Sequence, residues 1–165
     1  AVLPGARTTR TGIIGVMATT KTLASAKYRH LKSIAPKEVR IIDCPCPGLM
    51  DCVEAGEFRT PHTMALLREY VEPLVEAGAD TLVLGCTHYP LLEEVIGDFM
   101  GPDVTLIDSG AEAANLASTQ FDPNEGTGTT QYFVSDDPQG FDQLAELFLQ
   151  EKVDVGAELV DISRY

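Results

Sequence analysis

The fold is decided by the stretch Leu84-Gly85-Cys86-Thr87-His88-Tyr89-Pro90 and by the segments on either side of it. Before it stands Thr81-Leu82-Val83, a short apolar run typical of a buried parallel strand. After it, residues 91–99 predict an amphipathic helix with Pro90 in its first turn. Cys86 is therefore expected where a parallel strand ends and a helix begins, which is where open α/β sheets bind their ligands.

Cys86 and His88 bring a thiol and an imidazole to this strand end, and Thr87 adds a hydroxyl. The partial positive charge of a helix N-terminus favours a thiolate, and a nearby histidine adds to this by donating a hydrogen bond or a proton. The alternative interpretation is that Cys86 is a small buried apolar residue and His88 an ordinary surface histidine, because free cysteines are often simply buried.

Length, composition and charge limit the classes of protein to which the chain can belong. The 165 residues, 44% of them apolar, suit one domain, or one domain and part of another. The formal net charge of -13 argues against a nucleic-acid partner and against an anionic membrane surface. No apolar run approaches the length of a membrane span.

The four cysteines are Cys44, Cys46, Cys52 and Cys86. Without an export signal, and with enough apolar residues for a core, they are expected to be free thiols in a reducing cytoplasm. A structural zinc site is the alternative. The paired spacings common in zinc sites are largely missing, and the tight Pro-Cys-Pro turn opposes converging ligands, so we expect no metal.

The first part of the chain predicts a strand, a turn rich in hydroxyls and a helix. Residues 1–11 are expected to form a connection, 12–17 a buried strand and 22–34 a helix. The threonines of the turn favour two interpretations equally. They bind a carboxylate or phosphate together with backbone N–H groups, or Thr19 and Thr20 merely cap the helix.

The remaining elements continue the alternation of strands and helices. They are a strand at 39–43, a helical piece at 49–55, a helix capped by Thr60, a strand at 104–108, a helix from Ser109 to about Ser118, a polar loop or mobile hairpin at 122–130, a strand at 131–134, a helix from Pro138 and a strand at 159–162. This order predicts an α/β fold in which helices flank a parallel sheet.

The string from Gly85 to Leu92, GCTHYPLL, resembles the second catalytic-cysteine motif of the glutamate racemases, members of the aspartate/glutamate racemase superfamily. Residues 53–56 are similar to the Val-Glu-x-Gly segment of that family. The resemblance implies that Glu54 lies beside His88, orients it and holds its proton. It also implies that Cys86 acts on the substrate and that Thr87 and His88 help to bind it.

Residues 12–22 resemble a further family segment, Gly-Val-x-Gly-Thr-x-x-Thr, with Ala18 where the family usually has glycine. This implies that Thr19 and Thr22 line the substrate cleft. The family implies a cofactor-independent isomerase that supplies D-glutamate for peptidoglycan in the bacterial cell wall. Two thiols, one from each of two α/β lobes, act on opposite faces of the α-carbon of glutamate. Aspartate racemases typically carry Glu at the position of His88, so glutamate is the expected substrate.

The chain departs from the family at its start. The first cysteine segment, Cys-Asn-Thr, does not stand before the strand at Gly12, and the chain begins with Ala1. We therefore expect a fragment: one complete lobe at 1–108, and at 109–165 the returning tail of the other, incomplete lobe. The fragment alone is expected to be inactive. The open edges of the tail strands invite pairing with a second copy, and so a homo-oligomer, or disorder.

Three classes of function remain open on the sequence alone. The first is a glutamate racemase fragment, or one from an aspartate or other amino-acid racemase. The second is a non-catalytic protein of the same fold that binds or senses a small molecule. The third is a zinc-binding structural module.

Overall fold

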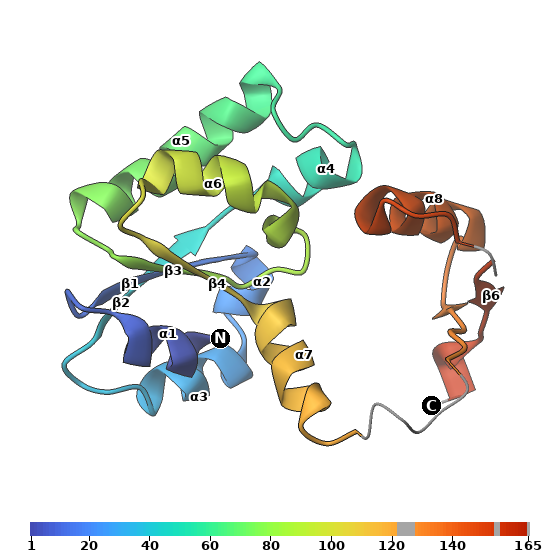
Figure 1. The fold of residues 1–165 in the computed structure, drawn as a ribbon, viewed down its shortest axis with the longest axis horizontal. Helices are drawn as coiled ribbons and strands as arrows, with labels where there is room; N and C mark the ends of the chain where they lie inside the picture. Colours follow the sequence, from blue (N-terminus) through green and yellow to red (C-terminus); the bar gives the residue numbers. More distant parts are fainter. Residues whose placement is uncertain (122–127, 154–155, 165) are drawn as a thin grey trace. The chain divides into compact units, whose positions relative to one another are not determined.

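The computed structural model describes residues 1–121, 128–153 and 156–164. The chain divides into two compact units, Ala1–Gln120 and Phe121–Tyr165, and each is described by itself (Figure 1). Most of the predicted polar loop at 122–130 lies outside the described residues.

A parallel sheet forms the centre of the first unit. Its four strands lie in the order β2-β1-β3-β4. Their bounds are β1 Ile13–Ala18, β2 Arg40–Pro45, β3 Thr81–Leu84 and β4 Thr105–Asp108. All three pairings are parallel, with Gly15 of β1 opposite Ile42 on one side and Leu82 on the other. The chain therefore passes from β1 to β2 and then back across β1 to β3, so the order of the strands reverses between β1 and β3.

Helices cover both faces of this sheet. The helices of the unit are α1 Val2–Thr8, α2 Thr20–Leu23, α3 Ala26–Ser33, α4 Leu49–Glu54, α5 Pro61–Glu76, α6 Glu93–Met100 and α7 Ser109–Ser118. In Figure 1, α1 and α3 lie on one face of the sheet and α5 and α6 on the other. The predicted class, a parallel α/β sheet flanked by helices, is confirmed.

The strand residues alternate between the two faces of the core. Val16 and Val83 pack with Val2 of α1 and Tyr28 of α3 on one face. On the other face, α5 lies so close to β1 that a Cβ at Gly15 would be 2.9 Å from a methyl carbon of Leu74. Burying an aliphatic side chain of this size contributes about 1.5–3 kcal/mol, so these contacts fix the helices on the sheet.

Residues 1–11 do not form the expected connection, because α1 covers Val2–Thr8. Pro4 and Gly5 lower the intrinsic helix propensity of this stretch. Pro4 falls in the first turn, where its missing N–H costs no hydrogen bond. Gly5 lies so close to β3 that a Cβ there would be 3.0 Å from Val83 Cγ2. Packing against the sheet therefore outweighs propensity here.

The helix expected at 22–34 is two helices, α2 and α3, that break at Ser25. The Ser25 side chain accepts a hydrogen bond from Tyr28 N at 3.1 Å, so this residue starts a new helix. The helix expected at 91–99 also begins differently. Residues Tyr89–Leu92 form a 3₁₀ turn, η1, and α6 begins only at Glu93. The break between the turn and α6 falls at Leu92, whose φ of -105° and ψ of 8° lie outside the α region.

In its described residues the second unit contains a pair of short strands and one long helix. β5 Phe133–Val134 pairs in parallel with β6 Glu158–Leu159. α8 covers Pro138–Leu149 and is capped by Asp137, and η2 covers Ile162–Arg164. The strands are shorter than the segments predicted for them, and Ile162 lies in η2. Whether their edges pair with a second copy stays a prediction, as does the expected lobe boundary at residue 108.

No helix in the described part of the chain is long and apolar enough to cross a membrane.

Candidate active site

Cys86 lies at the carboxyl end of β3, close to the point where the strand order reverses. Gly85 brings the chain there by donating its N–H to Met17 O of β1 at 2.8 Å. A Cβ at Gly85 would lie 2.9 Å from the same carbonyl oxygen and 3.2 Å from Ala18 Cβ, so only glycine permits this approach without strain. Cys86 is half-buried, whereas the other three cysteines are buried. Cys86 therefore lies at the end of a parallel strand, as expected from the sequence.

A thiol, an imidazole and a carboxylate follow one another at this edge. Cys86 Sγ lies 3.7 Å from His88 Nδ1, and His88 Nε2 lies 3.1 Å from Glu54 Oε1. Thr87 Oγ1 is 3.3 Å from the same Nδ1 atom. Glu54 is the last residue of α4, 34 positions before His88 in the sequence. The expected proximity of Glu54 and His88 is therefore met in the fold.

The order of these groups fixes the tautomer of neutral His88. An ionised carboxylate only accepts hydrogen bonds, so Glu54 Oε1 calls for a proton on His88 Nε2. The Nδ1 atom is then left to accept a hydrogen bond from the Thr87 hydroxyl or the Cys86 thiol. The His88 side chain is 19% exposed and the Glu54 side chain 42%. The arrangement can thus take up and release a proton at the thiol.

The position of Cys86 relative to α6 differs from the expectation. Six residues lie between Cys86 and the start of this helix at Glu93, because η1 intervenes. Within the turn, Tyr89 N donates to Cys86 O at 3.3 Å and Leu91 N donates to His88 O at 3.2 Å. The field of the α6 N-terminus falls off within one turn, so it does not act on Cys86 as the sequence suggested.

The buried side chain of Tyr89 holds the turn against the core. Its side chain is fully buried, and its hydroxyl donates to Cys46 O at 3.3 Å. Burial raises the pKa of the Tyr89 hydroxyl far above its usual range, and the nearby thiols of Cys46 and Cys86 add to the effect. Tyr89 therefore remains neutral and holds the turn in place rather than exchanging protons.

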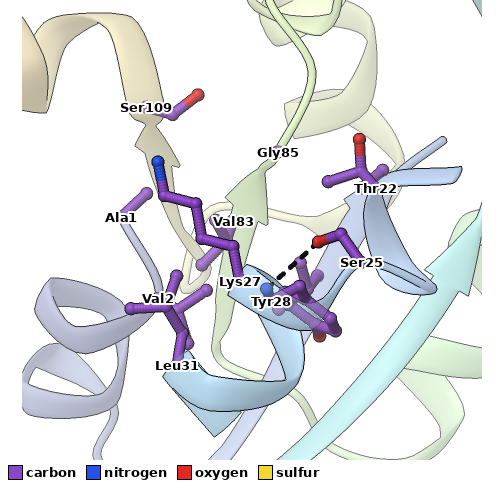
Figure 2. Close-up of a pocket in the computed structure, with 12 residues that line it drawn as sticks. Ala1, Val2, Thr22, Ser25, Lys27, Tyr28, Leu31, Val83, Gly85 and Ser109 are labelled. Atoms are coloured by element: carbon purple, nitrogen blue, oxygen red, sulfur yellow. Dashed lines mark hydrogen bonds between the residues drawn. The ribbon is translucent and has the colours of Figure 1, made fainter.

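A pocket of about 310 Å³ opens at the carboxyl ends of β1 and β3 (Figure 2). Val2 and Val83 supply part of its apolar wall, and Thr22, Ser25 and Ser109 supply hydroxyls. Other lining residues are Ala1, Val16, Ala18, Lys27, Tyr28, Leu31 and Gly85.

Of the two threonines expected in the cleft, only Thr22 is part of this lining in the described chain. Thr19 caps α2 instead: its Oγ1 accepts a hydrogen bond from Thr22 N at 3.2 Å and lies 3.0 Å from Thr22 Oγ1. For Thr19 the capping interpretation therefore describes the local geometry. Contact of either side chain with a substrate stays a prediction.

The sequence alone does not mark Ser109 and Lys27 as site residues. Ser109 follows β4, and its hydroxyl donates to Leu84 O at 2.9 Å, which ties the start of α7 to the end of β3. Its place after a predicted strand was a usable signal, since the carboxyl ends of parallel strands meet at one edge. Lys27 lies within α3, where nothing in the local pattern marks it.

The described residues contain no group of three or more His, Cys, Asp or Glu side chains that could hold a metal ion. Cys44 and Cys46 lie close together, with 3.8 Å between their Sγ atoms. Cys86 instead has His88 as its neighbour. The zinc alternative therefore receives no support from this arrangement.

The fold and the site together define an α/β protein with a thiol–imidazole–carboxylate group at the switch point of a parallel sheet. Residues 1–117 match the sequence profile of the family described as Asp/Glu/Hydantoin racemase. The chain belongs to this family.

Proteins of similar sequence and structure include glutamate racemases. A glutamate racemase of Ectopseudomonas mendocina is 43% identical over 160 residues, which are 94% of this chain and 61% of that protein. The crystal structure of a glutamate racemase isoform from Bacillus anthracis superposes with a TM-score of 0.80 at 29% identity, covering 98% of this chain and 64% of that one. The Escherichia coli glutamate racemase, determined with L-glutamate and the activator UDP-MurNAc-Ala, gives a TM-score of 0.76 at 25% identity over 98% of this chain and 62% of that one. The chain thus spans about three fifths of the length of these relatives.

Proposed function

We propose that this chain carries one of the two catalytic thiols of a glutamate racemase, an enzyme that interconverts L- and D-glutamate without a cofactor. The observation that carries the proposal is the succession of Cys86, His88 and Glu54 at the switch point of the sheet. The relatives support it, since they are named glutamate racemases and the Escherichia coli protein was determined with L-glutamate bound.

The proposed chemistry is transfer of the α-proton of glutamate to and from Cys86. In one direction the Cys86 thiolate removes the proton from one face of the α-carbon, and a second acid delivers a proton to the opposite face. In the other direction the Cys86 thiol is the donor. Such a reaction needs a group that serves as both acid and base near neutral pH, and a thiol beside a histidine meets this need.

His88 and Glu54 prepare the thiol for both roles. The carboxylate at Nε2 keeps Nδ1 of neutral His88 available to the Cys86 proton, and it stabilises the imidazolium when that proton is taken up. Negative charge develops on the substrate carboxylate as the α-proton leaves. The hydroxyls of Thr22 and Thr87 are suited to donate to this charge from the edge of the sheet.

The substrate is proposed to be glutamate rather than aspartate. The motif Cys86-Thr87-His88 has histidine where related aspartate racemases typically carry glutamate. The product would be D-glutamate for peptidoglycan, made in the cytoplasm.

The second acid is proposed to come from sequence outside this chain. Cys44, Cys46 and Cys52 are all buried in the first unit, the unit that also carries Cys86. A two-base reaction needs its groups on opposite faces of the α-carbon. The isolated chain is therefore proposed to lack racemase activity.

A chimera tests the proposal. This chain replaces the matching 160-residue part of the Ectopseudomonas mendocina racemase, and circular dichroism follows L-glutamate and L-aspartate in separate reactions. The expected result is loss of the L-glutamate signal to the racemic end point, with little change for aspartate. Cys86→Ala should abolish the reaction, whereas Cys52→Ala, which removes a buried thiol, should retain it. A folded chimera that leaves L-glutamate unchanged, or one that racemises aspartate equally well, would count against the proposal.

A further inference from the structure

Two buried thiols outside the candidate active site lie within reach of each other. Cys44 is the second-last residue of β2, and Cys46 is the first residue after the strand. Their Sγ atoms are 3.8 Å apart. Both side chains also contact backbone carbonyls: Cys46 Sγ lies 3.2 Å from Cys44 O, and Cys44 Sγ lies 3.3 Å from Tyr70 O. The proposed racemase chemistry uses neither thiol.

The backbone around the pair is held from several sides. Cys46 N donates to Ala18 O at 3.1 Å, and the Tyr89 hydroxyl donates to Cys46 O at 3.3 Å. Pro45 and Pro47, on either side of Cys46, each fix one backbone dihedral. The two sulfur atoms are therefore kept near each other by the fold, and not by a mobile loop.

A pocket gives small molecules an approach to Cys44. A pocket of about 500 Å³ lies between β2 and α5 and is lined by Cys44, with Tyr70 and Leu74 across from it. The lining includes Cys44 but not Cys46 or Cys52, so of these three cysteines Cys44 is the one that borders the pocket. Cys86 is not part of the lining of this pocket.

The two thiols differ in acidity. The pKa of the Cys44 thiol is lowered, chiefly because the Cys46 thiol donates a hydrogen bond to its sulfur, although burial opposes the effect. The pKa of Cys46 is raised far above its usual range by the same hydrogen bond and by burial. Cys44 is thus the more nucleophilic member, and Cys46 keeps its proton until a later step.

We propose that Cys44 and Cys46 form a peroxide-reactive dithiol site that closes reversibly to a disulfide. The Cys44 thiolate attacks one oxygen of hydrogen peroxide, the O–O bond breaks, and the departing hydroxide takes a proton to become water. Cys44 is then a sulfenic acid. The Cys46 sulfur attacks the Cys44 sulfur, the S–O bond breaks, and the hydroxide leaves with the Cys46 proton as a second water. Two thiols lose two electrons in total, and one peroxide is reduced to two waters.

The geometry allows the second step with a small movement. A disulfide has an S–S distance of about 2.05 Å, so the sulfurs must approach by roughly 1.8 Å from their 3.8 Å separation. A thiol reductant reverses the reaction by disulfide exchange.

The test uses the full 165-residue chain and its Cys86→Ser variant, in which the half-buried thiol is removed. Each is treated with hydrogen peroxide under native conditions, denatured, alkylated with iodoacetamide, digested and analysed by mass spectrometry. The expected result is that the peptide with Cys44 and Cys46 loses two hydrogen atoms and resists alkylation, and that dithiothreitol restores it. Cys52, equally buried but outside the pocket, should be alkylated in full.

Two single variants separate the roles. In Cys46→Ser the disulfide cannot form, so Cys44 should accumulate as a sulfenic acid that dimedone traps. In Cys44→Ser the oxidation of Cys46 should slow by about tenfold or more, since the Cys46 side chain is buried and does not line the pocket. The proposal is overturned if both thiols stay alkylatable at peroxide doses that oxidise Cys86 fully. It is equally overturned if Cys52 reacts as fast, or if the disulfide links two chains.

Discussion

Removing the charge of Asp80 should destabilise the first unit, because this carboxylate ties the segment before β1 to the start of β3. Thr9 Oγ1 donates to Oδ1 at 2.5 Å, and Thr81 Oγ1 donates to the same oxygen at 3.2 Å. Arg10 N and Thr11 N donate to Oδ2 at 2.7 and 2.9 Å. The Asp80 side chain is only 9% exposed, so water cannot replace these donors.

The size of the destabilisation depends on which hydrogen bonds each substitution at Asp80 can keep. In Asp80→Asn the amide oxygen can stay with the two backbone N–H groups, while the two hydroxyls turn to accept from the new NH₂ group. All four hydrogen bonds to the carboxylate then lose their charge assistance, which at about 0.5 kcal/mol each costs about 2 kcal/mol in all. In Asp80→Ala both backbone N–H groups lose their acceptor, which costs about 4 kcal/mol. The expected falls in melting temperature are roughly 8 and 15 °C.

The dependence on pH gives an independent check. Burial alone would raise the pKa of Asp80, but the hydrogen bonds from Thr9, Arg10 N and Thr11 N outweigh it and hold the pKa well below its usual range. A carboxylate of lowered pKa stabilises the fold in full above its unfolded pKa of about 3.9, and the contribution is lost as the pH falls toward the folded pKa. The difference in the free energy of unfolding between the native chain and Asp80→Asn should therefore be constant from pH 7 to 5 and become smaller at pH 3.

The assay is urea unfolding followed by far-ultraviolet circular dichroism at pH 7, 5 and 3, with Glu38→Gln as the control. Glu38 is an exposed acid, and its substitution should change the stability by less than about 0.5 kcal/mol. The reasoning would be refuted if Asp80→Asn lowered the free energy of unfolding by less than about 0.5 kcal/mol at pH 7, or if its difference from the native chain grew at low pH.

Three further outcomes follow from the region around Cys86. Gly85→Ala should lower the free energy of unfolding by about 1–3 kcal/mol in thermal melts, because the new Cβ would lie 2.9 Å from Met17 O. Gly97→Ala is the matched control. Gly97 lies within a helix and its Cβ would be 3.9 Å from Leu106, an ordinary contact, so this variant should be neutral or stabilising in the same melts. Cys86 should be the first cysteine alkylated by limiting iodoacetamide at neutral pH, because it alone of the four is not buried; mass mapping that finds Cys44, Cys46 or Cys52 labelled earlier would contradict this. Glu54→Gln should reduce kcat of the chimera by about tenfold to a hundredfold with little change in KM, since His88 loses the carboxylate at Nε2; unchanged kcat would remove Glu54 from the site.

The sheet could be predicted from the sequence because its signals are local. The apolar runs near Ile14, Ile41, Leu82 and Leu106 each give a strand of the observed sheet. Thr60 caps α5 as expected, accepting from Thr63 N. Parallel strands with intervening helices then bring Cys86 to the carboxyl edge without further information.

The features that escaped prediction depend on contacts distant in sequence, or on a single residue. The α1 helix forms where Gly5 and Val2 pack on β3, a condition that its own residues do not reveal. Ser25 was a usable cap signal within an otherwise helical pattern. Spacing alone could not place Glu54 beside His88, because the two residues are 34 positions apart and only the tertiary fold brings them together. The family resemblance supplied that expectation.

The central claim, that Cys86 is one of two thiols and needs a partner from outside this chain, is tested most directly by inversion of glutamate. L-glutamate is incubated with the purified chain, alone and with the separately expressed N-terminal segment of the Ectopseudomonas mendocina racemase, and its circular dichroism is followed. The prediction is no inversion by the chain alone, inversion when the segment is added, and none when Cys86→Ala replaces the native chain. Inversion by the chain alone that is lost in Cys86→Ala, or inversion by the mixture that survives Cys86→Ala, would contradict the claim.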